Sequence, residues 1–153
     1  MVRNNDIEKI VAYYVRLCGT NDPWKIAKML NVHMAVLPMG NVLGNYRYLK
    51  RIRWIFINED IIDNESLLKV VMAHELGHAL RHCKENCCFM AHHTLLLTSR
   101  VEREANEFAA HLLISDDMLQ EYAGRTREQF CQCTGYPKEL IELRLKSHTF
   151  KEV

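Results

Sequence analysis

The sequence lacks an excess of charge of either sign and lacks any long apolar run. Its 153 residues include 20 basic and 19 acidic side chains, for a formal net charge of +1. No strong field therefore favours nucleic acid or an anionic membrane. The tightest basic cluster, RYLKRIR at 47–53, alternates with apolar residues and is interpreted as the solvent face of a strand. No apolar stretch approaches the roughly 20 residues that span a bilayer. We therefore expect neither direct nucleic-acid binding nor a membrane partner.

An export segment and a disulfide framework are also missing. The first residues place Asp6, Glu8 and Lys9 where a secretory signal peptide needs an apolar run. We therefore expect a cytoplasmic protein in which the six cysteines are free thiols. Five metal-ligating residues nevertheless lie close together in the sequence: Cys83, Cys87, Cys88, His92 and His93. They leave a second metal site as an alternative, although they lack the paired two-residue spacing of a zinc ribbon.

The first half of the chain predicts two helices followed by a small sheet. Apolar residues recur at helical spacing over 5–18, and an Asp-Pro pair is typical of the start of a helix at 21–30. A short β-rich segment follows at 32–38. The segment 42–58 alternates apolar and polar residues and fits two antiparallel strands joined near Leu49–Arg51, although no Asn-Gly marks the turn. Together these segments predict an antiparallel sheet of about three strands.

A long buried helix is predicted next. Asp63 or Asn64 can cap it, and helical periodicity runs from Ser66 to about Cys83. Its apolar residues surround the helix and do not form one stripe, which is typical of a buried element. The irregular segment 84–98 is interpreted as a loop over the site. Ser99 then caps another helix.

The C-terminal part predicts three short helices, one over 115–124 and two within 126–147. The last two resemble a helix-turn-helix in outline, but the final segment mixes acidic residues with its basic ones, and we interpret it as a packed cap. The length predicts a single domain over 1–153 with an α+β fold, made of a catalytic core (1–114) and a C-terminal helical cap (115–153).

The segment MAHELGHALRH at 72–82 places two histidines four residues apart with a glutamate between them. Residues i and i+4 of a helix lie on one face, so His74 and His78 can direct imidazole nitrogens at one metal ion. Glu75 lies at the edge of the same site, where it can reach a water bound to the metal. Burying these side chains in an apolar helix without a cation would cost several kcal/mol. This HExxH pattern is typical of a metallopeptidase.

A catalytic metal site needs a third protein ligand. His82 lies a further turn along the helix, too far to share an ion with His74 and His78, and we interpret it as a histidine behind the site or at the surface. Lys84 stands where a third histidine six residues after His78 would be. The segment EREANEFAA at 102–110 offers a carboxylate instead.

Three glutamates in that segment compete for this position. Helical spacing places Glu102, Ala105 and Ala109 on one stripe, and the small alanines allow close approach to the HExxH helix. Glu104 lies about 200° around the helix and is expected to face solvent and to pair with a nearby arginine. Glu107 is flanked by basic residues one turn away on each side, which is typical of a surface position. Glu102 is therefore the best candidate ligand.

The predicted site consists of the metal ligands His74, His78 and Glu102, the catalytic residue Glu75, and Asn106, which can hydrogen-bond a ligand histidine from behind. Two imidazoles and a carboxylate suit Zn²⁺, although Mn²⁺ or Fe²⁺ can occupy such a set. Four residues are candidates for stabilising an oxyanion: Tyr46, Tyr48, His92 and His93.

The motif MAHELGHALRH followed by EREANEFAAHLLI resembles the motifs of the ImmA/IrrE family of metallo-endopeptidases. WIFINEDI upstream and CTGYPKELIELRLKS downstream are similar to the form carried by bacterial mobile elements, so the resemblance extends from about Asp22 onward. The family pattern E-x-x-A-N/D-x-F-A falls on Glu102, which also selects it over Glu104. Members often end this helix in LLMP, and this chain has LLIS, a departure that affects only the exit from the helix.

The resemblance implies a gluzincin-like core and a metal-dependent endopeptidase that acts as an anti-repressor. Its partner would be a helix-turn-helix repressor of a phage or mobile element, bound as an extended chain along the edge of the sheet formed by 42–57. The alternative is a metal-dependent binding module that sequesters a repressor without cutting it. A purely structural protein with a cryptic histidine cluster is a third possibility, and it predicts no bound metal.

Overall fold

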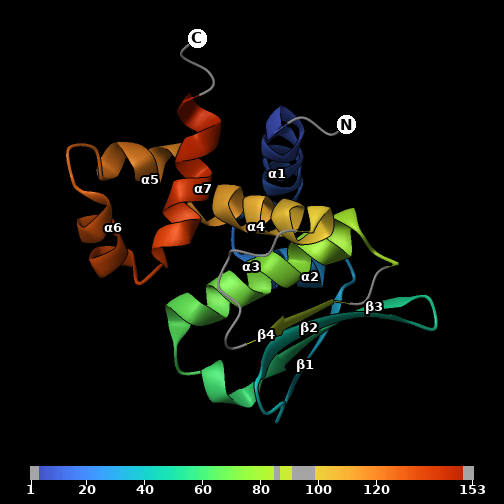
Figure 1. Cartoon of the computed structure of the whole chain (residues 1–153). Helices are drawn as coiled ribbons and strands as arrows, with labels where there is room; N and C mark the ends of the chain where they lie inside the picture. Colours follow the sequence, from blue (N-terminus) through green and yellow to red (C-terminus); the bar gives the residue numbers. More distant parts are fainter. Residues whose placement is uncertain (1–3, 85–86, 91–98, 150–153) are drawn as a thin grey trace.

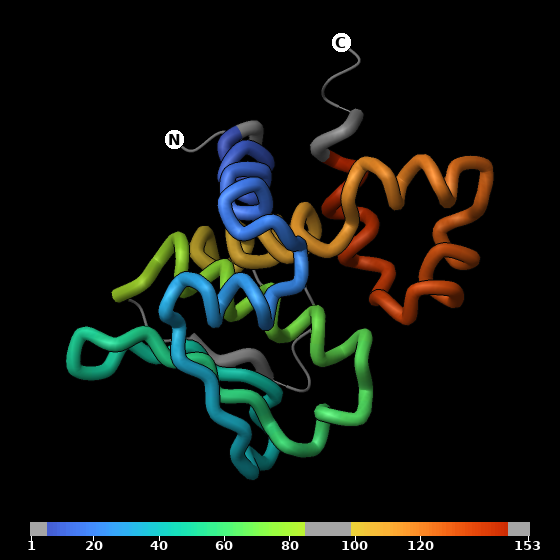
Figure 2. Tube along the Cα trace, turned by 180° about the vertical axis from the view of Figure 1, so that it is seen from behind, coloured from blue at the N-terminus to red at the C-terminus, as the bar shows by residue number. Residues whose placement is uncertain are grey.

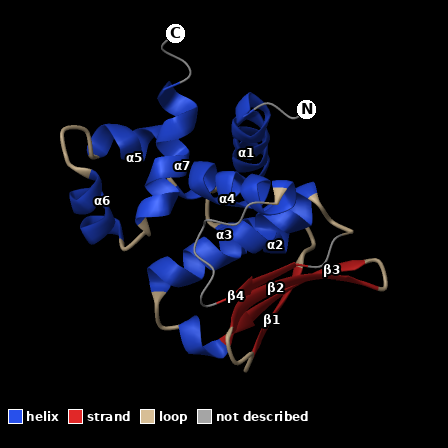
Figure 3. Ribbon diagram, in the orientation of Figure 1, coloured by secondary structure: helices blue, strands red, loops and turns tan. Residues whose placement is uncertain are grey.

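The computed structural model describes residues 4–84, 87–90 and 99–149. In these ranges the main helices lie on one side of a single β-sheet, and the layers are visible in Figure 1 and Figure 3. The elements in chain order are α1 (Asn4–Cys18), α2 (Pro23–Met29), β1 (His33–Leu37), β2 (Val42–Leu49), β3 (Ile52–Asn58), the short 3-10 helix η1 (Glu59–Ile61), α3 (Glu65–Arg81), β4 (Cys87–Met90), α4 (Arg100–Leu113), α5 (Asp116–Glu121), α6 (Arg127–Thr134) and α7 (Lys138–Thr149). The predicted α+β class is confirmed.

The sheet is mixed and has four described strands in the order β1-β3-β2-β4. β2 pairs antiparallel with β3 and with β4, but β1 pairs parallel with β3. The prediction of a small sheet is confirmed, but the sheet is mixed and not antiparallel, because β1 runs parallel to β3. The chain reverses direction twice between β1 and β3, so β3 runs in the direction of β1 and accepts it on its free edge. β4 lies inside the segment 84–98 that was interpreted as a loop.

The β2–β3 hairpin turns at Lys50 and Arg51, as expected, but without glycine or asparagine. Both residues have positive φ, 50° and 65°, the left-handed conformation that a tight two-residue hairpin needs. At the other end of β3, the Asn58 side-chain amide donates to the carbonyl oxygens of Gly40 (3.0 Å) and Val42 (2.9 Å). This pair of bonds ties the β1–β2 connection to the end of β3.

Helix α3 is the centre of the molecule. The Asn64 side chain caps it by accepting a hydrogen bond from the Leu67 backbone N–H at 3.2 Å, and Asn64 was one of the two predicted caps. Every residue from Val70 to Ala79 is buried, which confirms the prediction of an enclosed helix. The sheet covers one side of α3 through β2 and β3, and α4 covers another.

Helix α4 connects the centre to the remaining helices. Ser99 caps it as predicted, accepting from the Glu102 N–H at 3.3 Å. α1 and α7 both pack against α4, and Figure 2 shows them from behind. The predicted α2 cap is also present, since the Asp22 carboxylate accepts from the Trp24 N–H at 2.9 Å. None of the described helices combines the length and apolar character of a membrane-spanning segment.

The C-terminal helices pack onto the rest of the structure through α7. α7 buries Leu140 and Ile141 and contacts α4. Its Arg144 is 3% exposed; its Nε donates to the Ile114 carbonyl oxygen at 2.7 Å, and its guanidinium binds the Asp116 carboxylate. Arg144 therefore joins the end of α4 to the start of α5, so it is not a surface cation.

Candidate metal centre

Helix α3 presents His74, Glu75 and His78 in the interior. All three side chains are 0% exposed, and the apolar residues around them pack against the sheet on one side and α4 on the other. The i, i+4 spacing directs both imidazoles to the same side of the helix, as the sequence predicts. Their Nε2 atoms lie 3.1 Å apart.

Close contact between α3 and α4 brings the third predicted ligand, Glu102, close to the two histidines. A Cβ placed on Gly77 would lie 3.2 Å from the Ala105 Cα and 3.2 Å from the Phe108 Cβ, so no larger residue fits there without displacement. Ala105 supplies the small surface that the sequence predicts on α4, whereas the matching role of Gly77 was missed. An isolated glycine inside a helix pattern is the sequence feature that could have indicated it.

The Glu102 carboxylate lies against both imidazoles. Its Oε2 is 3.0 Å from His74 Nε2, and its Oε1 is 3.2 Å from His78 Nε2. The three residues form the group of possible metal ligands found among the described residues. Ligands about 2.0–2.1 Å from a tetrahedral zinc ion lie about 3.3 Å from one another. The separations of 3.0–3.2 Å therefore fit a small divalent cation with only slight expansion.

Asn106 determines which nitrogen of His74 faces Glu102. The Asn106 side-chain oxygen accepts a hydrogen bond from His74 Nδ1 at 2.7 Å, so the neutral imidazole carries its lone pair on Nε2. Burial lowers the pKa of His74 and favours this neutral form, although Glu102 opposes the shift. A lone pair thus faces a carboxylate oxygen at 3.0 Å. This arrangement is repulsive unless a cation lies between the two atoms.

The Glu75 carboxylate is buried next to this group, and no side chain in the described parts of the chain hydrogen-bonds to it. Burial raises the pKa of Glu75 well above its usual range; the nearby charge of Glu102 raises it further, and the Tyr46 backbone opposes the rise. A Cβ on Gly44 of β2 would lie 3.4 Å from Glu75 Oε1. The glycine in β2 therefore lets the sheet approach the carboxylate, a role that sequence reasoning missed.

The pKa values of Glu75 and Glu102 are shifted in opposite directions. Burial alone would raise the pKa of Glu102, but its contacts with His74 and His78 outweigh burial and hold that pKa well below its usual range. Glu102 is therefore an anion, and its side chain is 16% exposed. The buried Glu75 carboxylate, the anionic Glu102 carboxylate and the His74 lone pair, gathered beside the His78 imidazole, fit a bound divalent cation.

Glu104 corrects one prediction. It is 7% exposed and does not face solvent; its oxygens lie 2.9 Å from Arg100 Nε and 2.7 Å from His82 Nε2, and Arg81 is 3.5 Å away. The predicted pairing with a nearby arginine is present. The orientation differs because α3 continues beyond the site, and its last turn covers the side of α4 that a helical wheel assigns to solvent.

Two of the four oxyanion candidates can be placed. Tyr46 is fully buried and its hydroxyl donates to the Cys83 carbonyl oxygen, so it does not point at the candidate metal group. Tyr48 is half-buried and packs against the core. His92 and His93 lie outside the described residues, as do the side chains of Cys87 and Cys88. A second metal site formed by Cys83 together with those four residues therefore stays a prediction.

The structure also changes the edge along which a peptide could pair. β2 and β3, which form the 42–57 hairpin, are both internal strands because β4 covers β2 and β1 covers β3. The edges of β3 and the 42–46 part of β2 are therefore not available to an extended chain. The outer strands of the described sheet are β1 and β4.

Comparison with known proteins decides the family. The model of the IrrE N-terminal-like peptidase domain matches residues 27–146, which is most of the chain. This chain belongs to the ImmA/IrrE family. The match confirms the resemblance found in the sequence, and members of this family are metallopeptidases, in agreement with the group formed by His74, His78 and Glu102.

Two relatives extend the ImmA/IrrE assignment along the chain. The uncharacterized immunity region protein 2 of Bacillus phage phi105 is 32% identical over 143 residues, which cover 90% of this chain and 88% of that protein. The metallopeptidase ImmA of Bacillus subtilis (strain 168) is 25% identical over 143 residues, which cover 91% of this chain and 83% of that protein. Both alignments span nearly the whole length of the proteins compared.

Proposed function

We propose that this chain is a zinc-type metallo-endopeptidase that acts as an anti-repressor by cleaving a helix-turn-helix repressor of a phage or mobile element. One relative is named as a metallopeptidase and another as an immunity region protein of a phage. These names support a peptidase in a setting where a phage-type repressor acts. In this proposal His74, His78 and Glu102 hold the cation, and Asn106 fixes the orientation of His74 through the 2.7 Å hydrogen bond.

A divalent cation bound here would lower the pKa of a water molecule toward neutrality and polarise the carbonyl of a peptide bond. Glu75 is placed to accept the proton of that water and to transfer it to the leaving amine. No described side chain hydrogen-bonds its oxygens, so the carboxylate is available for this transfer. Burial excludes competing solvent from the same carboxylate.

The observation that carries the proposal is the Glu75 carboxylate, which is buried beside the three-residue group and which no described side chain pairs with. A module that only sequesters a repressor needs a metal for shape but has no use for such a carboxylate. Burying a carboxylate without a side-chain partner costs several kcal/mol. A role for Glu75 as general base in catalysis would explain why the protein keeps it.

The test is co-expression of the chain with a candidate repressor, followed by intact-mass analysis of the repressor and elemental analysis of the purified chain. The Glu75→Gln variant should retain its metal and leave the repressor uncut. Glu107→Gln is a matched control, because Glu107 is a half-buried glutamate of α4 outside the metal group. We expect it to cut at the wild-type rate. Metal-dependent binding without fragments from the wild-type chain would favour the sequestering module, and cutting by Glu75→Gln would refute the role of Glu75.

A further inference from the structure

The segment 23–58 separates the charges of this chain. It contains six of the 20 basic residues and none of the 19 acidic residues, so it carries a formal charge of +6 while the rest of the chain carries −5. The structure folds this segment into α2, β1, β2 and β3. The net charge of +1 therefore conceals an uneven distribution, which is a feature of proteins that bind polyanions.

The same segment leaves one face of the sheet open. Tyr46, Ile55 and Ile57 are 0% exposed and belong to the core beneath α3, whereas Trp54 and Phe56 are only half-buried. Because successive residues of a strand point to opposite faces, Trp54 and Phe56 lie on the side turned away from α3. Figure 1 and Figure 3 show α3 and α4 on the other side of the sheet. We call the side that carries Trp54 and Phe56 the open sheet face.

Aromatic rings form a row across the open sheet face. His33 of β1 is the cross-strand partner of Trp54, and their ring centroids lie 4.9 Å apart. Trp54 and Phe56 are stacked, with their ring planes 3° apart and their centroids 5.7 Å apart. Aromatic side chains displayed on a sheet are the surfaces on which unpaired bases of nucleic acids stack.

A hollow at the start of β1 extends this row of rings. Its volume is about 410 Å³, and its lining includes Trp24, Lys28, Asn31 and His33. The Trp24 side chain is 37% exposed, and the other three residues are exposed as well. Aromatic rings can stack on a base, an amide can hydrogen-bond to its edge, and an ammonium group can bind a phosphate. The hollow therefore offers the groups that a nucleotide needs.

Exposed cations border the rings and the hollow. Arg47 of β2 is the cross-strand partner of Trp54 and therefore lies on the same face. Lys50 and Arg51 form the turn that joins β2 to β3. Together with Lys28 these side chains are exposed, and none of them has a carboxylate oxygen within 4.0 Å in the part of the chain that the structure describes. Four cations are thus available to an anionic partner.

The acidic residues that flank the segment do not neutralise these cations. Asp22 precedes α2, and its carboxylate caps that helix. Glu59 and Asp60 follow β3 at the end opposite the hairpin turn. The Arg53 guanidinium donates to the Leu30 carbonyl oxygen at 2.6 Å, which holds the hairpin against the end of α2. The positive region is therefore continuous from α2 to the hairpin turn.

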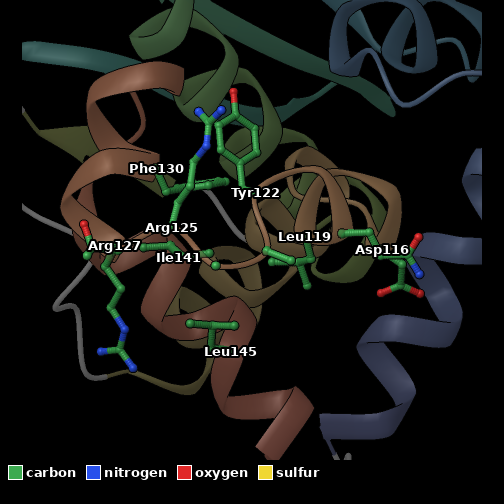
Figure 4. Close-up of a pocket in the computed structure, with 12 residues that line it drawn as sticks. Asp116, Leu119, Tyr122, Arg125, Arg127, Phe130, Ile141 and Leu145 are labelled. Carbon is green, nitrogen blue, oxygen red and sulfur yellow. The ribbon is translucent and has the colours of Figure 1, made fainter.

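Another hollow, of about 500 Å³, lies between α5, α6 and α7 and is shown in Figure 4. We call it the α5–α7 groove. Among the charges around it, Arg127 pairs with Glu142 at 3.6 Å, and Asp116 pairs with Arg144. The α5–α7 groove therefore does not offer the cluster of unpaired cations that borders the open sheet face.

We propose that the open sheet face, with the hollow beside it, binds single-stranded nucleic acid. Bases would stack on His33, Trp54 and Phe56 and enter the hollow beside Trp24, while phosphates would contact the four exposed cations. An acidic protein segment would match the charge, but the row of rings favours a ligand with repeated planar groups. The face is turned away from α3, so this site is separate from the candidate metal centre and does not rest on the proposed function. The proposal replaces the expectation of no nucleic-acid binding, which was based on the net charge alone.

The experiment measures the fluorescence anisotropy of a fluorescein-labelled oligo-dT strand with the full chain at low salt. A length of about 12 nucleotides is within the usual range of single-strand sites. One control is an abasic strand of the same length, which keeps the phosphates and lacks the bases, and another is a duplex of the same length. The oligo-dT strand should bind at least about tenfold more tightly than either control, because only its bases are free to stack.

Protein variants then locate the binding. The double variant Lys28→Gln and Arg47→Gln should weaken oligo-dT binding by about tenfold or more, and the slope of log affinity against log salt should change from roughly −2.8 to roughly −1.4. Lys9→Gln with Arg16→Gln is the matched control: it removes two exposed cations of α1 and should bind as the wild type does. His33→Ala removes an exposed ring and should weaken binding of oligo-dT but not of the abasic strand.

Several results would overturn the proposal. Equal binding of the abasic strand would show attraction to phosphate alone, and equal weakening by the α1 variant would show a diffuse effect of net charge. Displacement of oligo-dT by an equal concentration of a polyglutamate peptide would assign the face to an acidic protein. Binding to phosphatidylserine vesicles with no binding of oligo-dT would assign it to a membrane surface. Absence of oligo-dT binding at low salt would refute the site outright, whatever the outcome of the cleavage experiment.

Discussion

Replacing Gly77 by alanine tests whether the close approach of α3 and α4 determines the geometry of the metal centre. The added Cβ would lie 3.2 Å from Ala105 Cα and 3.3 Å from the Ala105 carbonyl oxygen. Ordinary carbon contacts lie at about 3.5–4.0 Å, so the helices must separate by a few tenths of an ångström. Glu102 is on the same helix as Ala105 and moves with it. Metal–ligand distances tolerate errors of only about 0.2 Å, so the separation is large enough to affect binding.

The effects of Gly77→Ala on stability and on metal affinity should differ in size. Alanine improves helix propensity by about 1 kcal/mol, while overpacking a core costs about 1–3 kcal/mol. We expect the free energy of unfolding of the metal-free protein to fall by about 1 kcal/mol. We expect the zinc affinity to fall by about 10–100-fold, as for other changes in the surroundings of metal ligands.

Two measurements separate these effects. Urea unfolding in the presence of a chelator reports the stability of the metal-free fold, and competition with a chromogenic chelator reports zinc affinity. Gly77→Val should lower the affinity further, because its larger side chain forces the helices farther apart. A Gly77→Ala protein that binds zinc as tightly as the wild type would refute the idea that this helix contact sets the position of Glu102.

Three further predictions concern the surroundings of the centre. Asn106→Ala should lower zinc affinity by about 10–100-fold in chelator competition, while Asn106→Asp, which keeps an acceptor for His74 Nδ1, should lose less; equal affinities would contradict this. Glu104→Gln should lower the free energy of unfolding at neutral pH by about 2 kcal/mol. Burial raises the pKa of Glu104, but Arg100 and His82 lower it below its usual 4.5, so this stabilisation is present above that value and disappears as the pH falls through the folded-state pKa. Urea unfolding across the acidic range should show the gap between variant and wild type closing, and a constant gap would refute the assignment. Saturating zinc at about a thousand times its Kd should add about 4 kcal/mol of stability, seen as a raised Tm that a chelator reverses; an unchanged Tm would argue against a metal site in the native fold.

The parts of the site that could be predicted depend on local spacing. His74, Glu75 and His78 lie within two turns of one helix, so their mutual arrangement follows from helical geometry alone. The stripe of Glu102 and Ala105 on α4 similarly predicts which face approaches α3. Helical spacing and the small residue Ala105 were therefore enough to predict that His74, His78 and Glu102 come together, as they do in the structure.

The features that sequence reasoning missed depend on partners far away in the chain. β4 is a strand only because β2 offers it an edge, and its four residues carry no alternating pattern of their own. The burial of Glu104 depends on how far α3 continues past the site, which a helical wheel of α4 does not contain. The parallel pairing of β1 follows from its choice of β3 as a neighbour. The α5–α7 groove likewise depends on the relative placement of three helices, although each helix was predicted.

The unbroken burial of Val70 to Ala79 has a consequence for saturation mutagenesis of this protein. Amphipathic helices usually produce a periodic profile, in which every third or fourth position rejects substitution and those between accept it. Substitutions at each of these ten consecutive positions should instead reduce activity, because every position contributes either to packing or to the chemistry of the site. Abundance measured alongside activity would divide these positions into two classes. Glu75 should be intolerant in the activity readout while its glutamine variant accumulates normally, whereas Met72 and Leu76 should fail in both.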